Sequence, residues 1–145
     1  MKKDLVSIII PYFKKKIFFL KSFNSAYKQT YKKKEILIVY DDPDLSDLSF
    51  IKKIIKNKKN VYLYVNNKNH GVGPSRNLAI KKSNGEFLAF IDSDDIWKKQ
   101  KLNKQIQFMK KNKLTASFTS YSIINSFGKI IDFRPAKKNI TFKDL

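Results

Sequence analysis

Short, continuous apolar runs alternate with stretches of helical spacing four times in this chain, and this alternation restricts the fold most strongly. The apolar runs at 5–10, 35–40, 61–65 and 86–91 indicate strands, of which the first suits burial on both faces and the second is also predicted to be buried. Strands that alternate with helices require a largely parallel sheet covered by helices on both faces. The sequence therefore predicts an α/β fold.

The segments between and after these strands carry helix and hairpin signals. Apolar residues recur at helical spacing over 17–29, 45–56 and 97–111, and Pro74 suits the first turn of a helix that Asn84-Gly85 ends. Strands at 115–124 and 129–133 are predicted to pair through Ser126-Phe127-Gly128. No repeat or linker is present, and 145 residues suffice for a core, so one domain is expected over residues 1–145.

Acidic residues gather directly after two of the predicted strands, although the chain is strongly basic. It has 31 Lys and Arg residues against 12 Asp and Glu, a formal net charge of +19. The acids that follow the two strands are Asp41, Asp42, Asp44, Asp47, Asp92, Asp94 and Asp95. Carboxylates this close repel one another unless a cation or a hydrogen-bonding ligand offsets their charge. A hard divalent ion that also binds a substrate phosphate is the expected occupant.

The polar features converge on one edge of the predicted sheet. Pro11, Asp41-Asp42, the 69–76 loop and Asp92-Ser93-Asp94 all lie at or near the carboxyl ends of strands. Ligands of open parallel sheets bind outside these ends. We therefore expect these residues to form a single site.

The basic excess does not by itself identify a partner. Only two of the basic residues are arginine, Arg76 and Arg134, and the lysines are scattered along the predicted helices. Asn, Ile, Phe and Tyr are also abundant, and all share A/T-rich codons with Lys, so base composition accounts for the bias. We expect no nucleic-acid partner, because clustered arginine and an aromatic stacking platform are lacking. Attraction to an anionic membrane surface stays open.

Compartment signals are few. Cysteine is absent, which excludes disulfides and thiolate metal sites. The amino-terminal apolar run is too short for a signal peptide, and no run approaches about 18 apolar residues. A cytoplasmic protein is expected, with peripheral association with the inner membrane face as an alternative.

Six motifs, in order, resemble the glycosyltransferase family 2 nucleotide-sugar transferases of the GT-A fold. The resemblance covers nearly the whole chain. The motifs are Val6-Ser-Ile-Ile-Ile-Pro-Tyr12, Gln29-Thr30-Tyr31, Glu35-Ile-Leu-Ile-Val, Asp41-Asp42, Asn69-His-Gly-Val-Gly-Pro-Ser-Arg76-Asn77, and Gly85-Glu-Phe-Leu-Ala-Phe-Ile-Asp-Ser-Asp-Asp95 followed by Trp97. The resemblance implies a Rossmann-like GT-A sheet. It also implies inverting, metal-dependent transfer of a sugar, with a UDP-sugar as the expected donor and a glycan or lipid-linked acceptor, in cell-surface polysaccharide synthesis.

The resemblance assigns roles to the second acidic cluster. In the family, the second acid of Asp-X-Asp binds Mn²⁺ or Mg²⁺ that bridges the diphosphate, and the first contacts the ribose. These positions are Asp94 and Asp92, and both are expected beside the metal, with Ser93 at the nucleotide. Such an ion offsets the charge that builds on the departing diphosphate. The alternative, a helix-start turn capped by Asp95, accounts for only one of these acids.

The first cluster and its neighbours are assigned to the nucleotide. Asp41 resembles the family acid that accepts a hydrogen bond from the base, typically uracil, with Asp42 beside it. Pro11 and Tyr12 would supply backbone contacts and a wall for the base ring. The acidic pocket of a phospho-acceptor receiver domain is an alternative, but it needs a further strand-end Asp and a later Lys that the other landmarks do not match.

Arg76 opens a helix after a glycine-containing loop, where its guanidinium and the helix amides suit a diphosphate. The resemblance implies a nucleotide contact, and a structural salt bridge with a clustered acid is the alternative. Gly71 and Gly73 are expected to permit the turn. His70 is the only histidine and is not expected to act as a base.

The chain departs from the family pattern at three points. Tyr12-Phe13-Lys14-Lys15 replaces a common Thr-Tyr-Asn-Arg, and Pro43-Asp44 replaces a common Gly-Ser. The family's acceptor-binding half, which carries the general base, is expected beyond Leu145. The chain is thus expected to be the leading part of a transferase, or a non-catalytic module completed by a partner chain or a second copy. A phosphatase using Asp92-Ser-Asp94 is a weaker alternative, since the later Lys and acid pair it needs are not found.

Overall fold

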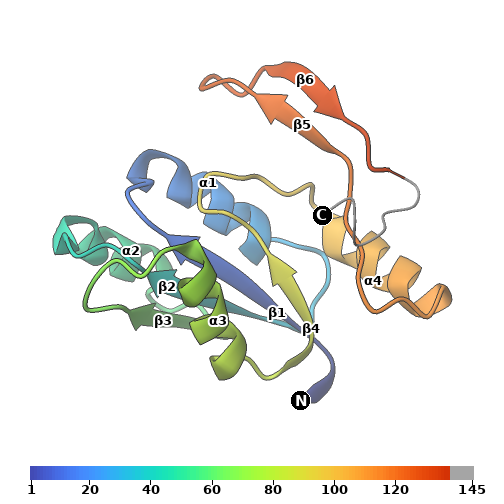
Figure 1. Ribbon diagram of the computed structural model, residues 1–145, viewed down its shortest axis with the longest axis horizontal. Coiled ribbons are helices and arrows are strands. Elements are labelled where there is room, and N and C mark those ends of the chain that lie inside the picture. Colours follow the sequence, from blue (N-terminus) through green and yellow to red (C-terminus); the bar gives the residue numbers. More distant parts are fainter. Residues whose placement is uncertain (138–145) are drawn as a thin grey trace. The chain divides into compact units, whose positions relative to one another are not determined.

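The computed structural model describes residues 1–137, which fall into two compact units (Figure 1). The first unit is Met1–Lys104, and the second begins at Gln105. The expectation of one domain over the whole chain stays a prediction.

The first unit is built on a four-stranded parallel sheet with the order β3-β2-β1-β4. Its strands are β1 Lys2–Tyr12, β2 Lys34–Tyr40, β3 Val61–Val65 and β4 Gly85–Phe90. Strand β1 pairs with β2 from Val6 opposite Lys34 to Tyr12 opposite Tyr40, and it pairs with β4 on its other edge. The predicted parallel α/β fold is therefore confirmed, and the two central strands are the longest apolar runs.

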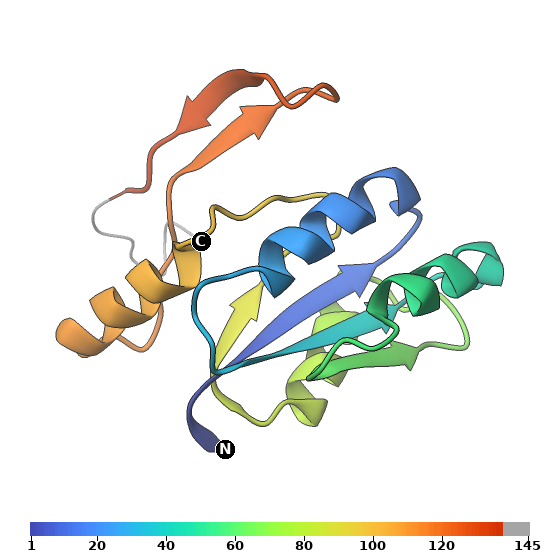
Figure 2. The ribbon, with the colours of Figure 1, turned by 180° about the vertical axis from the view of Figure 1, so that it is seen from behind.

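Helices cover both faces of this sheet. They are α1 Lys16–Tyr27, α2 Leu48–Ile55 and α3 Val72–Lys82, with one 3₁₀ turn, η1 Leu45–Asp47, leading into α2. Helices α1 and α2 lie on one face, and α3 packs on β1 and β2 from the other (Figures 1 and 2). Pro74 occupies the first turn of α3, as predicted, where its missing N–H has no helical partner to lose.

Helix α1 buries only part of the apolar stripe that its spacing predicts, which comprises Ile17, Leu20, Phe23, Ala26 and Tyr27. Ile17 is 84% exposed and Leu20 is 44% exposed, although both belong to the predicted apolar stripe. The buried residues are Phe19, Ser22, Phe23 and Ala26. Phe19 packs edge-on against Tyr12, with ring centroids 5.2 Å apart. This aromatic packing and the buried Ser22, not the count of aliphatic residues, fix the orientation of the helix.

A buried carboxylate fixes the register at the amino edge of the sheet. Glu35 Oε1 accepts hydrogen bonds from Ser7 Oγ at 2.6 Å and from the Asn84 backbone N at 2.7 Å. Gly85 is required beside this contact, because a Cβ there would lie 2.5 Å from Ser7 Oγ. These contacts join the first residues of β2 and β4 to β1.

The helix predicted from Trp97 begins later, as α4 Lys101–Lys111. Residues 97–100 are held out of the helix by α1 and the residues that follow it, since Ser25 Oγ accepts from Trp97 N and Gln29 Nε2 donates to Lys98 O. Side-chain contacts from another element thus displace a helix start that local periodicity had placed four residues earlier.

The second unit contains an antiparallel hairpin, β5 Tyr121–Ile124 and β6 Ile130–Arg134. Its turn is closed by Asn125 Oδ1, which accepts from the backbone N of Phe127 and of Lys129. Gly128 adopts a left-handed φ of 84° in this turn. The predicted hairpin is confirmed, but its first strand begins at Tyr121, not at residue 115. None of the helices within residues 1–137 is long and apolar enough to cross a membrane.

Candidate functional site

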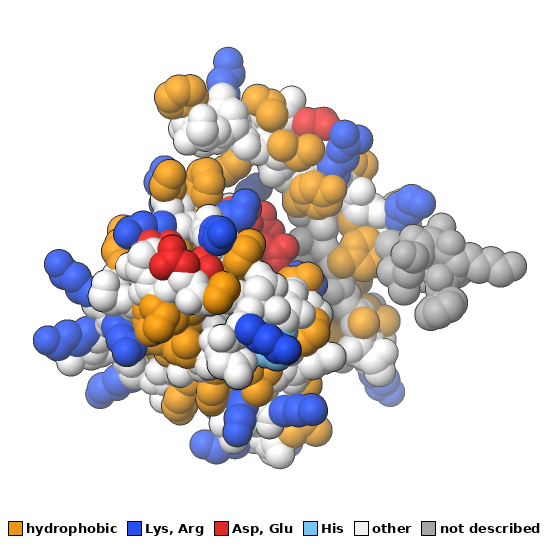
Figure 3. Space-filling view, turned by 60° about the vertical axis from the view of Figure 1, so that its left-hand side comes forward, with side chains coloured by type: hydrophobic (Ala, Val, Ile, Leu, Met, Phe, Trp, Pro, Cys, Tyr) orange, Lys and Arg blue, Asp and Glu red, His pale blue; other side chains and the backbone are white. Residues whose placement is uncertain are grey.

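A solvent-open cavity of about 370 Å³, which we call the acidic cavity, lies at the carboxyl edge of the first unit's sheet. Its lining comprises Pro11, Tyr12, Phe13, Lys15, Asp41, Asn69, Gly71, Val72, Asp92, Ser93 and Asp94. Six of the eight predicted site residues are among them. The exceptions are Asp42 and Arg76, which do not line the cavity. Figure 3 shows acidic side chains gathered near the centre of one face, while Lys and Arg side chains project around its outline.

Two cations already neutralise the predicted metal-binding pair. Arg76 Nη2 lies 2.6 Å from Asp92 Oδ1, and Lys15 Nζ lies 2.8 Å from Asp94 Oδ2. Both pairs are exposed to solvent, which screens their charges, so each contributes little to stability. The salt-bridge alternative for Arg76 is therefore observed, and its contact with a nucleotide stays a prediction.

Asp95 differs from its two acidic neighbours. Burial raises the pKa of its carboxyl, and the charges of Asp92 and Asp94 raise that pKa further. The Asp95 backbone N donates to Asp92 O at 3.0 Å, which closes a turn. Helix α4 begins six residues later, so the reading of Asp95 as a helix cap is wrong.

The donor set at this turn fits a divalent ion that a substrate also binds. Within residues 1–137, no group of three or more His, Cys, Asp or Glu side chains is arranged to hold a metal ion. Asp92 and Asp94 provide two carboxylates on one cavity. Mg²⁺ typically uses one or two carboxylates together with substrate phosphates, not a full protein cage. The chemistry of the residues therefore suits such an ion only together with a phosphate ligand.

Asp41 organises the loop between β3 and α3. Its Oδ1 accepts from Asn66 Nδ2 at 2.6 Å and from the backbone N of His70 at 2.9 Å, and its Oδ2 accepts from Gly71 N at 2.8 Å. A carboxylate offers about four acceptor positions, so about one remains for a ligand. The role of Asp41 in binding a base stays a prediction.

Glycine is needed at one position of this loop. Gly71 has a φ of 86°, which side-chain-bearing residues rarely adopt, and its N–H points at Asp41. Gly73 instead lies within the first turn of α3. The expectation that Gly71 permits the turn is confirmed, and for Gly73 it is wrong.

Asp42 is buried and shapes the turn after β2. Its Oδ1 accepts from the Asp44 backbone N at 3.1 Å, and its side chain faces away from the cavity lining. Its assignment to the nucleotide stays a prediction, and its observed contact is structural.

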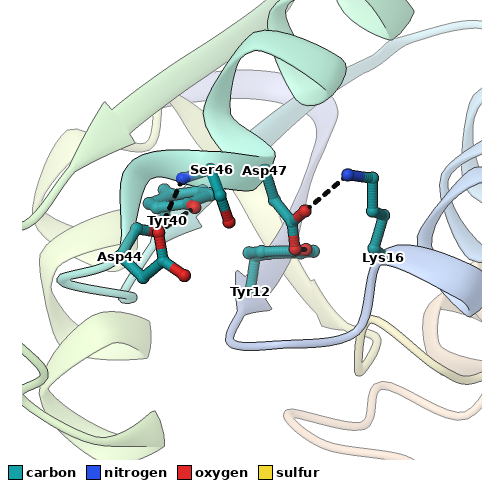
Figure 4. A network of polar contacts seen from close by, with 6 residues as sticks. All are labelled: Tyr12, Lys16, Tyr40, Asp44, Ser46 and Asp47. Carbon is teal, nitrogen blue, oxygen red and sulfur yellow. Dashed lines mark hydrogen bonds and ion pairs between the residues drawn. The ribbon is translucent and has the colours of Figure 1, made fainter.

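The Tyr12 ring belongs to the core. It is fully buried and stacks on Tyr40, with ring centroids 5.1 Å apart. Its hydroxyl donates to Asp47 Oδ2 at 2.6 Å, and Lys16 pairs with the other oxygen at 2.9 Å (Figure 4). Burial, and then the bond to Asp47, hold the pKa of Tyr12 above its ordinary value. Tyr12 therefore fixes the strand end, and it does not present an exposed wall to a base ring.

Sequence reasoning missed Phe13 and Lys15 as lining residues, whereas Asn69 belongs to the 69–76 loop that was expected at the site. Phe13 is 42% exposed, so it can supply the aromatic surface that Tyr12 does not. Lys15 stands where the family pattern Thr-Tyr-Asn-Arg has its arginine, so a cation is retained at this place. The place of Lys15 in this four-residue pattern was the signal by which it could have been found.

Polar residues of helix α1 and of the segment after it support the turn at Asp92–Asp95, which we call the acidic turn. Ser22 Oγ donates to Asp92 O at 2.9 Å, and Ser25 Oγ accepts from Trp97 N at 3.0 Å. Gln29 Nε2 donates to Lys98 O, and Gln29 Oε1 accepts from Leu102 N. Ser22 and Ser25 are three residues apart on one face of α1, and Gln29 follows two residues after the helix ends. They hold the backbone that carries Asp92 and Asp94.

Comparison with known proteins gives consistent results. A family model described as Glycosyl transferase family 2 matches residues 7–142. The UDP-Glc:alpha-D-GlcNAc-diphosphoundecaprenol beta-1,3-glucosyltransferase WfgD of Escherichia coli is 37% identical over 145 residues, which is 100% of this chain and 56% of that protein. An uncharacterized glycosyltransferase of Rickettsia felis is 40% identical over 127 residues, 88% of this chain.

A solved structure shares the fold. S. aureus TarS 1-349 in complex with UDP superposes with a TM-score of 0.65 and 32% sequence identity, covering 74% of this chain and 32% of that one. The chain spans 21% of the length of the R. felis relative and 56% of the E. coli relative.

Proposed function

This chain belongs to glycosyltransferase family 2, and we propose that it forms the nucleotide-sugar-binding part of a metal-dependent inverting glycosyltransferase. The observation that carries this proposal is the convergence of Asp41, Asp92 and Asp94 with Lys15 on one cavity. Carboxylates that can accept from a base or hold a cation thus adjoin a cation that can bind phosphate.

The metal assignment rests on the chemistry of the acidic turn. Asp94 and Asp92 would hold Mn²⁺ or Mg²⁺ together with the diphosphate of the donor. The ion would supply charge neutralisation as the bond from the sugar to the diphosphate breaks.

The two cations that pair with Asp92 and Asp94 would change partners when the donor binds. In the free protein Arg76 and Lys15 pair with Asp92 and Asp94. A divalent ion on the carboxylates would release both cations to the phosphate oxygens. The site would therefore keep each charge paired in the free and the bound state, which lowers the cost of burying the diphosphate.

The transfer needs a base outside this cavity. As the acceptor hydroxyl attacks the anomeric carbon, the carbon–oxygen bond to the diphosphate breaks and the hydroxyl proton passes to a base. Asp41 is assigned to the nucleobase, and Asp92 and Asp94 are assigned to the metal. We therefore assign the general base to the family's acceptor-binding half, which is expected beyond residue 145.

The donor and acceptor are proposed from relatives. The E. coli relative is named for UDP-Glc and a GlcNAc-diphosphoundecaprenol acceptor, and the TarS structure contains UDP. We propose a UDP-sugar donor and a lipid-linked or glycan acceptor of a cell-surface polysaccharide. Peripheral association with the acceptor's membrane would follow, supported by the net charge of +19.

Calorimetric titration with UDP, with and without Mn²⁺, tests this proposal. Asp94→Asn should weaken Mn²⁺-dependent UDP binding about tenfold or more, because it removes a charged ligand. Asp132→Asn, at an exposed hairpin residue, should leave the affinity unchanged. Equal UDP affinity with and without Mn²⁺, or an unaltered D94N variant, would refute the metal assignment.

A transfer assay separates the two forms of the proposal. UDP-sugar turnover by the 145-residue chain alone would contradict the assignment of the base beyond residue 145. Tight Mn²⁺-dependent binding without turnover would support a binding part that needs the remainder of the protein, a partner chain or a second copy.

A further inference from the structure

A second cavity, lined by lysines, lies at the opposite edge of the same sheet. It has a volume of about 240 Å³ and is lined by Tyr27, Lys32, Lys34, Ile36, Lys59 and Asn60, which together define the lysine cavity. Ile36 lies near the start of β2, five residues before Asp41. At about 3.3 Å per residue, the two cavities are separated by about 16 Å of strand.

The lysine cavity contains three cationic side chains and no carboxylate among its lining residues. Glu35 is adjacent in sequence, but successive residues of a strand face opposite sides of the sheet. Its carboxylate is instead engaged by Ser7 and Asn84 on the other side. Lys58 adds a fourth cation at the margin, 5.2 Å from the centre of the Tyr27 ring.

Lys34 is the anchored cation of this group. It is half-buried, and its Nζ donates to Gln29 O at 3.1 Å and to Tyr31 O at 2.9 Å. An ammonium has three N–H donors, so one remains for a ligand. Burial, and then the charge of Lys32, lower the pKa of Lys34. The position of this cation is thus fixed by the backbone, and none of the ion pairs described within residues 1–137 joins it to an acid.

We propose that the lysine cavity binds a phosphate group, carried by a free phosphate compound or by a lipid headgroup. A tetrahedral dianion can accept from one N–H of the fixed Lys34 and from the mobile ammonium groups of Lys32 and Lys59. The side-chain amide of Asn60 adds a neutral donor at the same wall. The site shares no residue with the acidic cavity, so its occupancy does not depend on the proposed transferase function.

Titration of the full chain with inorganic phosphate, in EDTA, tests the proposal. Lys32→Gln combined with Lys59→Gln should weaken binding about tenfold, because two charge-assisted contacts are lost. Both lysines are exposed, so the urea midpoint should not change. Lys34 is left intact because it also holds two backbone carbonyls.

Lys81→Gln combined with Lys82→Gln is the matched control, since it removes the same charge from exposed positions of α3. It should change the affinity less than about twofold. Equal weakening by the two double variants would mean diffuse attraction to a basic protein and would overturn the proposal. Absence of saturable binding in the unmodified chain, both to phosphate and to the vesicles below, would also overturn it.

Two further measurements locate the site and its ligand source. Amide NMR shifts on adding phosphate should centre on Tyr27, Ile36 and Asn60, and Asp92→Asn with Asp94→Asn should not alter the affinity. Shifts centred on the acidic cavity instead would contradict the proposal. Phosphatidylcholine vesicles with and without phosphatidic acid separate the sources, because binding that needs phosphatidic acid and is lost in the Lys32 and Lys59 variant indicates a headgroup.

Discussion

At the scale of single residues, Asp41 has the largest effect on the form of the acidic cavity. Its carboxylate accepts two backbone N–H groups and one side-chain amide, all from the loop that precedes α3. Asp42, its equally buried neighbour, accepts only one backbone N–H. Two adjacent acids that look alike in the sequence therefore differ in the number of hydrogen bonds that they accept.

We expect Asp41→Asn to lower the free energy of unfolding by roughly 2 kcal/mol, because its amide would face a donor and leave a buried N–H unpaired. The amides of His70 and Gly71 should then exchange faster with deuterium. Asp42→Asn is the control and should cost less than about 1 kcal/mol, because its carbonyl oxygen can still accept from Asp44 N. Urea unfolding distinguishes the two, and equal losses would contradict this account.

The Tyr12 hydroxyl makes a second residue-scale prediction possible. The bond from Tyr12, and then the contact with Lys16, lower the pKa of Asp47. Tyr12→Phe should raise the pKa of Asp47, measured by carboxyl NMR titration, and should cost about 1 kcal/mol of stability. Tyr121→Phe, at a 61% exposed ring, should change neither quantity. An unaltered Asp47 pKa in the Y12F variant would disprove the coupling.

At the scale of elements, α1 connects the core to the acidic turn. Its aromatic residues pack beneath the sheet's end, where Phe19 and Phe23 stack 6.0 Å apart. Its polar residues on the adjoining stripe hold the backbone that follows β4. The same helix therefore fixes both the strand end that carries Pro11 and the turn that carries Asp92.

Gln29→Ala should test the support that α1 and the residues after it give to the acidic turn. Gln29 is 2% exposed and bonds to Ser25 O, Lys98 O and Leu102 N, so its loss should cost roughly 2–3 kcal/mol. The Leu102 amide should exchange faster, and Mn²⁺-dependent UDP binding should weaken because the acidic turn loses support. Gln100→Ala, at an exposed position, is the control. Normal protection of the Leu102 amide from hydrogen exchange in Q29A would contradict this role of Gln29.

At the scale of the whole first unit, the two edges of the sheet have different tasks. The carboxyl edge carries the acidic cavity, whereas the amino edge is closed by Glu35, Ser7 and Asn84. Burial alone would raise the pKa of Glu35, but the hydrogen bonds from Ser7 and Asn84 outweigh it and lower that pKa. The ionised carboxylate is thus the form that the fold stabilises.

This lowered pKa sets a pH dependence of stability. A depressed pKa contributes stability above the ordinary carboxyl pKa of about 4.5, and the contribution is lost as the pH falls through the folded value. Glu35→Gln should cost roughly 1–2 kcal/mol at pH 7, because its amide N–H₂ opposes a donor. The difference from the unmodified chain should shrink between about pH 5 and pH 3 in urea titrations. Ser49→Ala, at an exposed position of α2, is the control, and its difference in stability from the unmodified chain should not depend on pH.

Much of the architecture could be predicted because its signals are local. Continuous apolar runs identify buried parallel strands, and β1, β2, β3 and β4 were all found in this way. The acids after β2 and β4 indicated one site, since carboxyl ends of parallel strands meet at one edge. The errors concern α1, where Ile17 and Leu20 of the predicted stripe are exposed, and α4, whose start was placed too early. Contacts with other elements decide both.

The sequence alone determined the order and direction of the strands and the edge at which acids accumulate, because side-chain periodicity and strand ends are properties of the chain itself. Only the tertiary structure decided that Lys15 and Arg76 neutralise Asp94 and Asp92, that Tyr12 is buried, and that three lysines surround a second cavity. These facts depend on distances between residues far apart in the chain. Such distances follow from packing, which no local pattern records.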